Sequence, residues 1–295
     1  MVGGEAGMAQ GWIRLGAVLC LSALVACGED AGPITPEDVD ALEPLDAISA
    51  SNLTEIMLTV SDPEDAVDYF REGLAREPDN LEFRRGLGQS LARAGRHSEA
   101  AILYQDIAAE GIATDEDRLI YAEILVRENA FDAAAGQLAV LDDQPNNYSY
   151  NLLNAVVADH YEQWSLADGY YERARRLTTR PTAVLNNWGI SRMSRGDLPA
   201  AIETFREAIT LDPAAFRPKN NLVIARGLSG IYTLPVVPMS GEEKAQLYHN
   251  LALVALRQGQ SETAKGLLRQ AVDAHPRFFP AAADKLAALE AIVQL

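Results

Sequence analysis

The chain has 295 residues, a formal net charge of −17 at pH 7 and a calculated isoelectric point of about 4.6. Such an acidic chain cannot use charge to grip the phosphates of DNA or RNA, and its folded part is a poor partner for an anionic membrane surface. We therefore expect no nucleic-acid partner. The length suits either two ordinary domains or one array of structural repeats.

Residues 1–26 have the features of a secretory signal. An apolar run from Leu15 to Ala26 follows Arg14 and is too short to span a bilayer comfortably. The run ends in the letters LVAC, which resemble a bacterial lipobox, where small residues precede an acceptor cysteine. This resemblance implies that Cys27 receives a diacylglycerol thioether after cleavage behind Ala26. The alternative is a buried cysteine that follows alanine by chance.

Residues 27–46 read as a tether between this anchor and the folded part. The segment is acidic, contains proline and has no lysine or arginine, so it cannot bury enough apolar surface to fold. Gly28 rather than aspartate follows the cysteine, which by analogy with lipoprotein sorting favours the periplasmic face of the outer membrane. The chain's other cysteine, Cys20, lies in the apolar run, so we expect no disulfide framework and no zinc site.

A repeat of about 34 residues runs through the middle of the chain. Five alanines recur in steps of 34, 34, 33 and 34, and a large apolar residue follows each of them after four places. These pairs are Ala66/Phe70, Ala100/Tyr104, Ala134/Leu138, Ala167/Tyr171 and Ala201/Phe205. This period is that of the tetratricopeptide repeat (TPR), in which a small residue lets two helices approach and a bulky one fills the gap. We predict an all-α fold over residues 47–295, a right-handed TPR solenoid of helical hairpins.

Two segments near the carboxyl terminus depart from this repeat. Pro235 and Pro238 fall where the second helix of the sixth repeat should lie, so residues 231–240 are predicted to form an extended strap. The strap either seals the core between neighbouring helices or shapes a site for a partner. We favour sealing, because an exposed apolar run would be a liability. A capping helix is expected at about 280–293, with Leu286, Leu289 and Ile292 covering the last open face.

Residues 185–290 resemble the TadD family of TPR lipoproteins, which belong to tight-adherence (Tad) pilus systems. The resemblance rests on the motifs LNNWG, FREAITLDP, KNNLVIARG, YTLPVVPMS, LALVALRQGQ, KGLLRQAVDAHP and PAAADKLAALE. The strap motif is the most specific of them, because generic TPR arrays lack it. The resemblance implies a pilotin-like factor that helps the outer-membrane secretin to assemble, and it brings no catalytic residues.

The sequence contains no pattern typical of an active site. The four histidines are scattered, and there is no glycine-rich phosphate loop, nucleophile elbow or HExxH helix. We therefore expect no enzyme activity, no catalytic residue, no metal and no cofactor.

A row of asparagines is the better candidate site. Asn187, Asn221 and Asn250 occupy the same place in three successive first helices, which line the inner wall of a TPR superhelix. An amide offers both a donor and an acceptor, so it can bind a peptide backbone of any sequence. The alternative is that these amides bond to neighbouring backbone. Further candidates beside them are Arg217, Ile224, Leu253 and Arg257.

These observations lead to a leading function and one alternative. The first is a membrane-tethered TPR scaffold, anchored through Cys27, that binds a secretin or another component of a Tad-type pilus. The alternative is a lipoprotein adaptor that delivers substrates to an envelope protease or a cell-wall hydrolase. Genes for a secretin, an ATPase and a prepilin beside this one would support the first.

Overall fold

The structure is a computed structural model that describes residues 53–291, and from Thr54 onward the chain forms one compact unit. The predicted signal, the tether and Cys27 lie outside the described residues. Within these residues every regular element is a helix. After helical residues 53–59, the helices are α3 (Pro63–Arg76), α4 (Leu81–Arg93), α5 (His97–Ala109), α6 (Asp115–Arg127), α7 (Phe131–Ala139), α8 (Tyr148–His160), α9 (Trp164–Arg176), α10 (Thr182–Ser194), α11 (Leu198–Leu211), α12 (Phe216–Leu228), α13 (Gly241–Arg257), α14 (Ser261–Ala274) and α15 (Pro280–Ala291).

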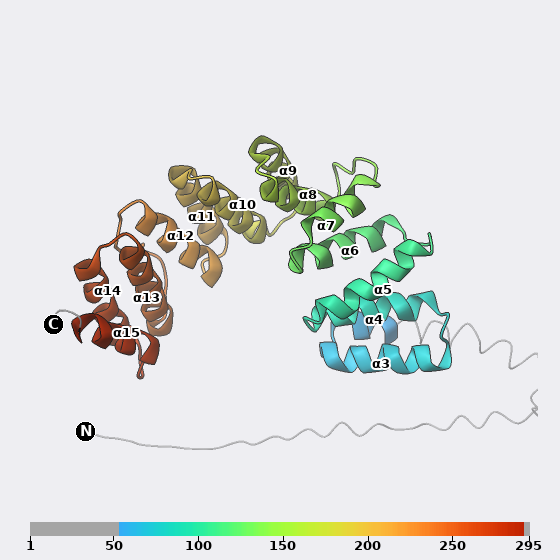
Figure 1. Cartoon of the computed structure of the whole chain (residues 1–295), viewed down its shortest axis with the longest axis horizontal. Coiled ribbons are helices and arrows are strands. Elements are labelled where there is room, and N and C mark those ends of the chain that lie inside the picture. The colour runs from blue at the N-terminus through green and yellow to red at the C-terminus, as the bar shows by residue number, and fades with distance from the viewer. Residues whose placement is uncertain (1–52, 292–295) are drawn as a thin grey trace, which may run out of the picture. The chain divides into compact units, whose positions relative to one another are not determined.

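Consecutive helices pair into hairpins, as Figure 1 shows along the coloured ribbon. Helices α4, α6, α8, α10, α12 and α13 are the first helices of their repeats, and α3, α5, α7, α9, α11 and α14 are second helices. Each first helix packs on its own second helix, where it has one, and also contacts the first helix of the next repeat. First helices therefore form an unbroken row. The prediction of an all-α array of hairpins is confirmed for the described residues.

The repeating small residue is buried between the helices of each hairpin. All five repeat alanines are fully buried, and their bulky partners are at most 3% exposed. On the facing first helix, Gly189 lies so close to Phe205 that an added Cβ would overlap the ring, and Gly88 is equally close to Tyr104. The helices approach at these points because no side chain keeps them apart.

The turn between the two helices of a hairpin needs a left-handed residue. Glycine provides it at Gly95, Gly196 and Gly259, with φ between 75° and 84°. The third and fourth repeats have Asn129 and Glu162 there instead, at φ 59° and 56°. Asparagine tolerates this region moderately well, whereas glutamate is strained in it, so Glu162 is held there by the helices on either side.

The strap, residues 231–240, replaces the second helix of the sixth repeat with non-helical chain. Tyr232, Leu234 and Met239 are half-buried against the apolar core of α13–α15, and Val237 packs on the core formed with α11 and α12. Val236 points outward and is fully exposed. The strap therefore contacts both neighbouring cores, at the place where a second helix would lie in a complete repeat. These contacts support the view that the strap seals the core.

Helix α15 packs against α14 at the carboxyl end of the described chain. Ala282 is fully buried there, and Leu286 and Leu289 are partly buried against the same core. Ile292, the third residue expected on this face, lies outside the described residues. The array thus ends on a helix that has no hairpin partner of its own among residues 53–291.

Replacing Gly189 with alanine tests the close approach of α10 and α11. Because the new Cβ would overlap the fully buried Phe205 ring, we expect Gly189→Ala to lower the free energy of unfolding by about 1–3 kcal/mol. Gly169→Ala in α9 is the matched control, because its Cβ would meet nothing within 4 Å. Since alanine is the better helix former, this change should raise the free energy of unfolding by about 0.5–1 kcal/mol. Urea unfolding followed by circular dichroism measures both. Equal shifts for the two variants would show that the approach is not tight.

Two substitutions in the strap separate sealing from docking. Leu234→Asp would place a charge without a partner in the α13–α15 core, and we expect it to cost about 1–3 kcal/mol and lower the melting temperature. Val236→Asp adds the same charge two residues away, at a fully exposed position, and should leave the melting temperature unchanged. A thermal melt of each variant is the measurement. If Leu234→Asp melts like the parent protein, the strap does not seal the core.

Candidate functional site

The asparagines predicted from the sequence lie in the row of first helices. Asn187 is in α10, Asn221 in α12 and Asn250 in α13, and all three side chains are half-buried. They are not equivalent in their bonding. Asn221 and Asn250 each donate a hydrogen bond to an asparagine on the preceding first helix, whereas the Asn187 amide makes no hydrogen bond within residues 53–291.

These bonds form a ladder of amides across three repeats. The Asn221 Nδ2 donates to the Asn186 Oδ1 at 2.8 Å, and the Asn250 Nδ2 donates to the Asn220 Oδ1 at 2.7 Å. A longer bond of 3.4 Å, from the Asn220 Nδ2 to the Asn221 Oδ1, connects the two pairs. Asn221 and Asn250 thus bond to side chains of the preceding first helix and not to neighbouring backbone. Asn186 and Asn220 were not among the expected site residues. The only signal for them was the doubled asparagine in LNNWG and KNNL.

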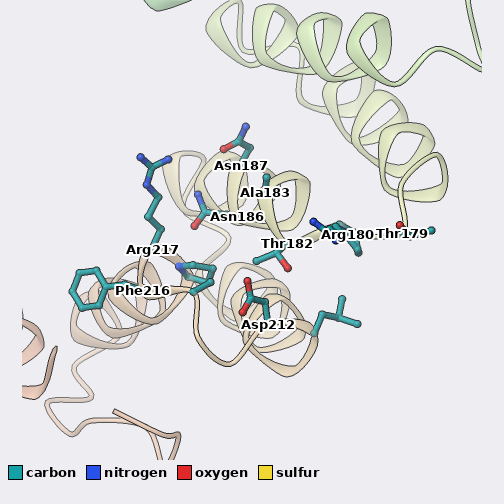
Figure 2. A pocket seen from close by; sticks show the side chains of 13 residues that line it. Thr179, Arg180, Thr182, Ala183, Asn186, Asn187, Asp212, Phe216 and Arg217 are labelled. Atoms are coloured by element: carbon teal, nitrogen blue, oxygen red, sulfur yellow. The ribbon is translucent and has the colours of Figure 1, made fainter. Parts of the chain in front are cut away.

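A pocket beside this ladder has a volume of about 730 Å³ and opens between the starts of α10 and α12. Asn186 and Asn187 line it from α10, and Arg217 lines it from α12. In Figure 2 Arg217 and Arg180 lie on opposite sides of Asn186 and Thr182, which also line the pocket. We call this space the α10–α12 pocket. It brings together two of the residues expected from the sequence, Asn187 and Arg217.

A second pocket of about 350 Å³ lies between α8 and α10. Its apolar lining consists of Phe131, Val156, Trp164 and Ile190, and Asn187 lines it as well. We call it the α8–α10 pocket. Because one residue belongs to the lining of both pockets, they adjoin at Asn187.

Asp159 forms the polar floor of the α8–α10 pocket. Its carboxylate accepts hydrogen bonds from the Tyr171 hydroxyl at 2.7 Å and from the Ser191 hydroxyl at 2.6 Å. Burial raises the pKa of Asp159 above its ordinary value, although these two bonds oppose the shift. Beside it the His160 ring stacks on Phe131, with ring centroids 3.9 Å apart. These contacts fix the pocket wall in one arrangement.

Neighbouring polar contacts tie α10 to α9. The Trp188 Nε1 donates to Asp168 at 2.5 Å, and Arg195 forms an ion pair with the same carboxylate at 2.9 Å. The Arg192 guanidinium lies over the Trp188 ring, 4.0 Å from its centroid. Asn187 is therefore carried by a helix whose neighbouring side chains Trp188 and Arg195 are bonded to α9.

The other expected residues are placed along the same row. Ile224 and Leu253 are half-buried at equivalent positions of α12 and α13, one turn after Asn221 and Asn250, and Arg257 is exposed at the end of α13. Asn250 also lines a third pocket, of about 540 Å³, together with His249 and His275. Burial lowers the pKa of His249. The binding role of all these residues stays a prediction.

The described part of the chain offers no group of three His, Cys, Asp or Glu side chains that could hold a metal ion. Between residues 53 and 291, no helix is both long and apolar enough to cross a bilayer.

Comparison with known proteins identifies the repeats. Residues 58–114 match one family model described as a tetratricopeptide repeat, and residues 246–277 match another. These two segments are tetratricopeptide repeats, and the fold of the described chain is that of a TPR array. The matched segments contain α3–α5 at one end of this TPR protein and most of α13 and α14 at the other. TPR arrays are scaffolds that bind protein partners, and their all-α fold is typical of proteins without catalytic activity.

Solved structures share this fold. In the crystal structure of the APC/C hetero-tetramer Cut9-Hcn1, the matching chain is 16% identical with a TM-score of 0.56. The match covers 80% of the present chain and 48% of that one, so this TPR protein spans about half of its length. A TPR protein from Parabacteroides merdae ATCC 43184 is 13% identical with a TM-score of 0.51, over 85% of this chain and 98% of that one. At such identities the likeness shows the fold alone. No curated protein matches the sequence.

The ladder predicts different effects for neighbouring asparagines. Asn221→Ala removes the donor to Asn186 and an acceptor for Asn220, and we expect it to cost about 0.5–1.5 kcal/mol of stability. Asn187→Ala removes no internal hydrogen bond of the described chain and should change stability by less than about 0.5 kcal/mol. Denaturant unfolding of both variants measures the difference. A loss at Asn187 as large as that at Asn221 would contradict the assignment of Asn187 to binding.

Proposed function

We propose that this TPR protein is a lipid-anchored scaffold that assists assembly of a Tad-type pilus. It acts at the periplasmic face of the outer membrane, where it holds a segment of the secretin or of another Tad component. The observation that carries the proposal is the position of Asn187, which lies between two adjoining pockets on the row of first helices. Its amide makes no hydrogen bond to another described residue.

The geometry around Asn187 supports binding of an extended segment. An extended peptide places side chains to either side of each peptide group. An amide with a free donor and a free acceptor can bond to that peptide group, while the flanking side chains enter the two pockets. Asn221 and Asn250 contribute by keeping α10, α12 and α13 in register through the ladder.

The amino-terminal sequence supports the anchor. The apolar run ending at Cys27 resembles a lipobox, and Gly28 follows the cysteine. A stable lipid anchor needs two or more acyl chains, at about 0.8 kcal/mol for each buried methylene. The acidic residues 28–46 then separate the array from the membrane and, because of their charge, keep clear of anionic lipids.

The strap supports the connection to Tad pili. It is the motif on which the resemblance to the TadD family depends most, and residues 231–240 replace the second helix that a generic TPR would have at this place. Four of its side chains pack on the two adjacent cores, so the departure is a built feature of the array.

Loss of the acceptor cysteine tests anchoring and function together. In cells whose own gene is deleted, we expect Cys27→Ser to abolish palmitate labelling and flotation with outer membranes, because the thiol that carries the lipid is gone. We further expect fewer secretin multimers on gels of unheated membranes. Cys20→Ser is the matched control, since Cys20 lies in the part of the signal that is removed, and it should behave like the parent protein.

Two results would overturn parts of this proposal. Continued labelling and flotation of Cys27→Ser would remove the anchor. Normal secretin multimers in the deletion strain would remove the pilus role, and accumulation of envelope-protease or cell-wall-hydrolase substrates in that strain would favour the adaptor instead.

A further inference from the structure

We propose that the α10–α12 pocket binds a carboxylate of the partner segment and that the α8–α10 pocket takes the apolar side chain beside it. This inference rests on the proposed function only in that the row of first helices holds a partner. It adds the chemistry of that partner: an acidic group next to a large apolar residue. The carboxylate belongs either to an Asp or Glu side chain or to a free carboxyl terminus.

The first observation is an amide in the wall of the α10–α12 pocket that is bonded only through its oxygen. Asn186 is only 9% exposed, and its Oδ1 is occupied by the hydrogen bond from Asn221. Its Nδ2 donates no hydrogen bond within residues 53–291, although the side chain lines the pocket. The ladder therefore turns the amide so that its acceptor is used internally and its donor remains for a ligand oxygen. The Nδ2 atom is open to the pocket, where a ligand oxygen can accept a hydrogen bond from it.

The second observation is that two helices begin at this pocket without side-chain caps. The first helices α4, α6, α8 and α13 have capping side chains, from Asn80, Thr114, Asn147 and Ser240. In α10 and α12 the capping positions are held by Pro181 and Ala215, which provide no such bond, and both residues line the pocket. The first N–H groups of α10, and those of Phe216 and Arg217 in α12, therefore lie at one space with the positive ends of two helix dipoles; Pro218 of α12 has no N–H, and the carboxyl end of α11 lines the same space.

The charged side chains at the pocket complete the preference for an anion. Arg180 and Arg217 line it, and neither forms an ion pair with a residue in the described range. The pocket also contains Asp212, whose Oδ1 accepts a hydrogen bond from the Ala214 N–H at 3.1 Å. One oxygen of this carboxylate is therefore already hydrogen-bonded. Two positively charged side chains and one negatively charged side chain line the pocket. The local balance is positive, in contrast to the chain as a whole.

The adjoining α8–α10 pocket fits an apolar side chain. Phe131, Val156 and Trp164 form its lining with Ile190, which is 38% exposed although it is large and apolar. Covering these groups would remove apolar surface from water. Because Asn187 lines both pockets, the acidic and the apolar group must lie close together in the partner, with a peptide group between them at the Asn187 amide.

Selection from random peptides tests this chemistry without knowledge of the partner. Residues 28–295, which include the compact unit from Thr54 onward, would be used as bait for two displayed libraries. One library ends in a free carboxyl terminus, and in the other the random segment is internal. We expect enrichment of Asp or Glu near Phe, Leu, Ile or Trp in the internal library if a side chain is bound. Enrichment of apolar residues at the last positions of the free-end library alone would assign the terminal carboxylate.

Variants of the bait then locate the contact. The double change Arg180→Gln, Arg217→Gln should weaken the binding of an enriched peptide by roughly fivefold at low salt. The expected effect is modest because both arginines are exposed and solvent screens their charges. Arg206→Gln on α11 is the matched control, because Arg206 is an exposed arginine outside the lining of both pockets, and it should change nothing. Circular dichroism confirms that each bait is folded.

Three outcomes would overturn the inference: no enriched peptide, enriched peptides without acidic groups, or equal affinity for the parent and the double variant. None of them would affect the anchor or the secretin assay, so failure of this inference is distinguishable from failure of the proposed function.

Discussion

The contact on which the rest of the array depends is the close approach of two helices at a small residue. In each hairpin a fully buried alanine of the second helix, and in the second and fifth repeats also a glycine of the first, removes the side chain that would separate the backbones. The bulky residue four places later then fills the space that remains, as Phe205 does against Gly189. Because this contact recurs at a nearly constant interval, successive first helices are brought to similar positions, and side chains at equivalent places become neighbours.

The asparagine ladder is a consequence of that regularity. A hydrogen bond of 2.7–2.8 Å between side chains on different helices requires the helices to hold their spacing closely. The same pairing occurs twice, from α12 back to α10 and from α13 back to α12. It survives the loss of the second helix from the sixth repeat, because the strap packs into the two cores and keeps α12 against α13. The strap thus preserves the row of first helices across an interruption of the repeat.

The sequence was sufficient for the fold because its determinants are local and periodic. Recurrent alanines, bulky partners and turn glycines each report one contact inside a hairpin, and prolines mark the place where a helix cannot form. The turns of the third and fourth repeats carry no glycine signal in the sequence, because Asn129 and Glu162 replace glycine at the left-handed position.

The site could be predicted only in part. Asn187 and Arg217 share a pocket as residues of neighbouring first helices, but the pairing of Asn221 with Asn186 depends on distances between helices that no pattern records.

The acidity of the whole chain and the positive character of one pocket are compatible for a physical reason. At physiological ionic strength, charges separated by more than about 8 Å in solvent are largely screened, so most of the chain's carboxylates contribute little inside the α10–α12 pocket. The charges that act there belong to the residues that line the pocket: two arginines, one partly satisfied carboxylate, the starts of two helices without side-chain caps and the carboxyl end of α11. Net charge therefore excludes partners that bind by long-range attraction, such as nucleic acids, without excluding a short acidic segment that enters the pocket.

The negative charge of the chain also selects among acidic partners. A protein that is acidic over its whole surface would be repelled before its carboxylate reached Asn186. A single acidic group flanked by apolar residues avoids that repulsion, and it is the kind of segment for which the two adjoining pockets are shaped.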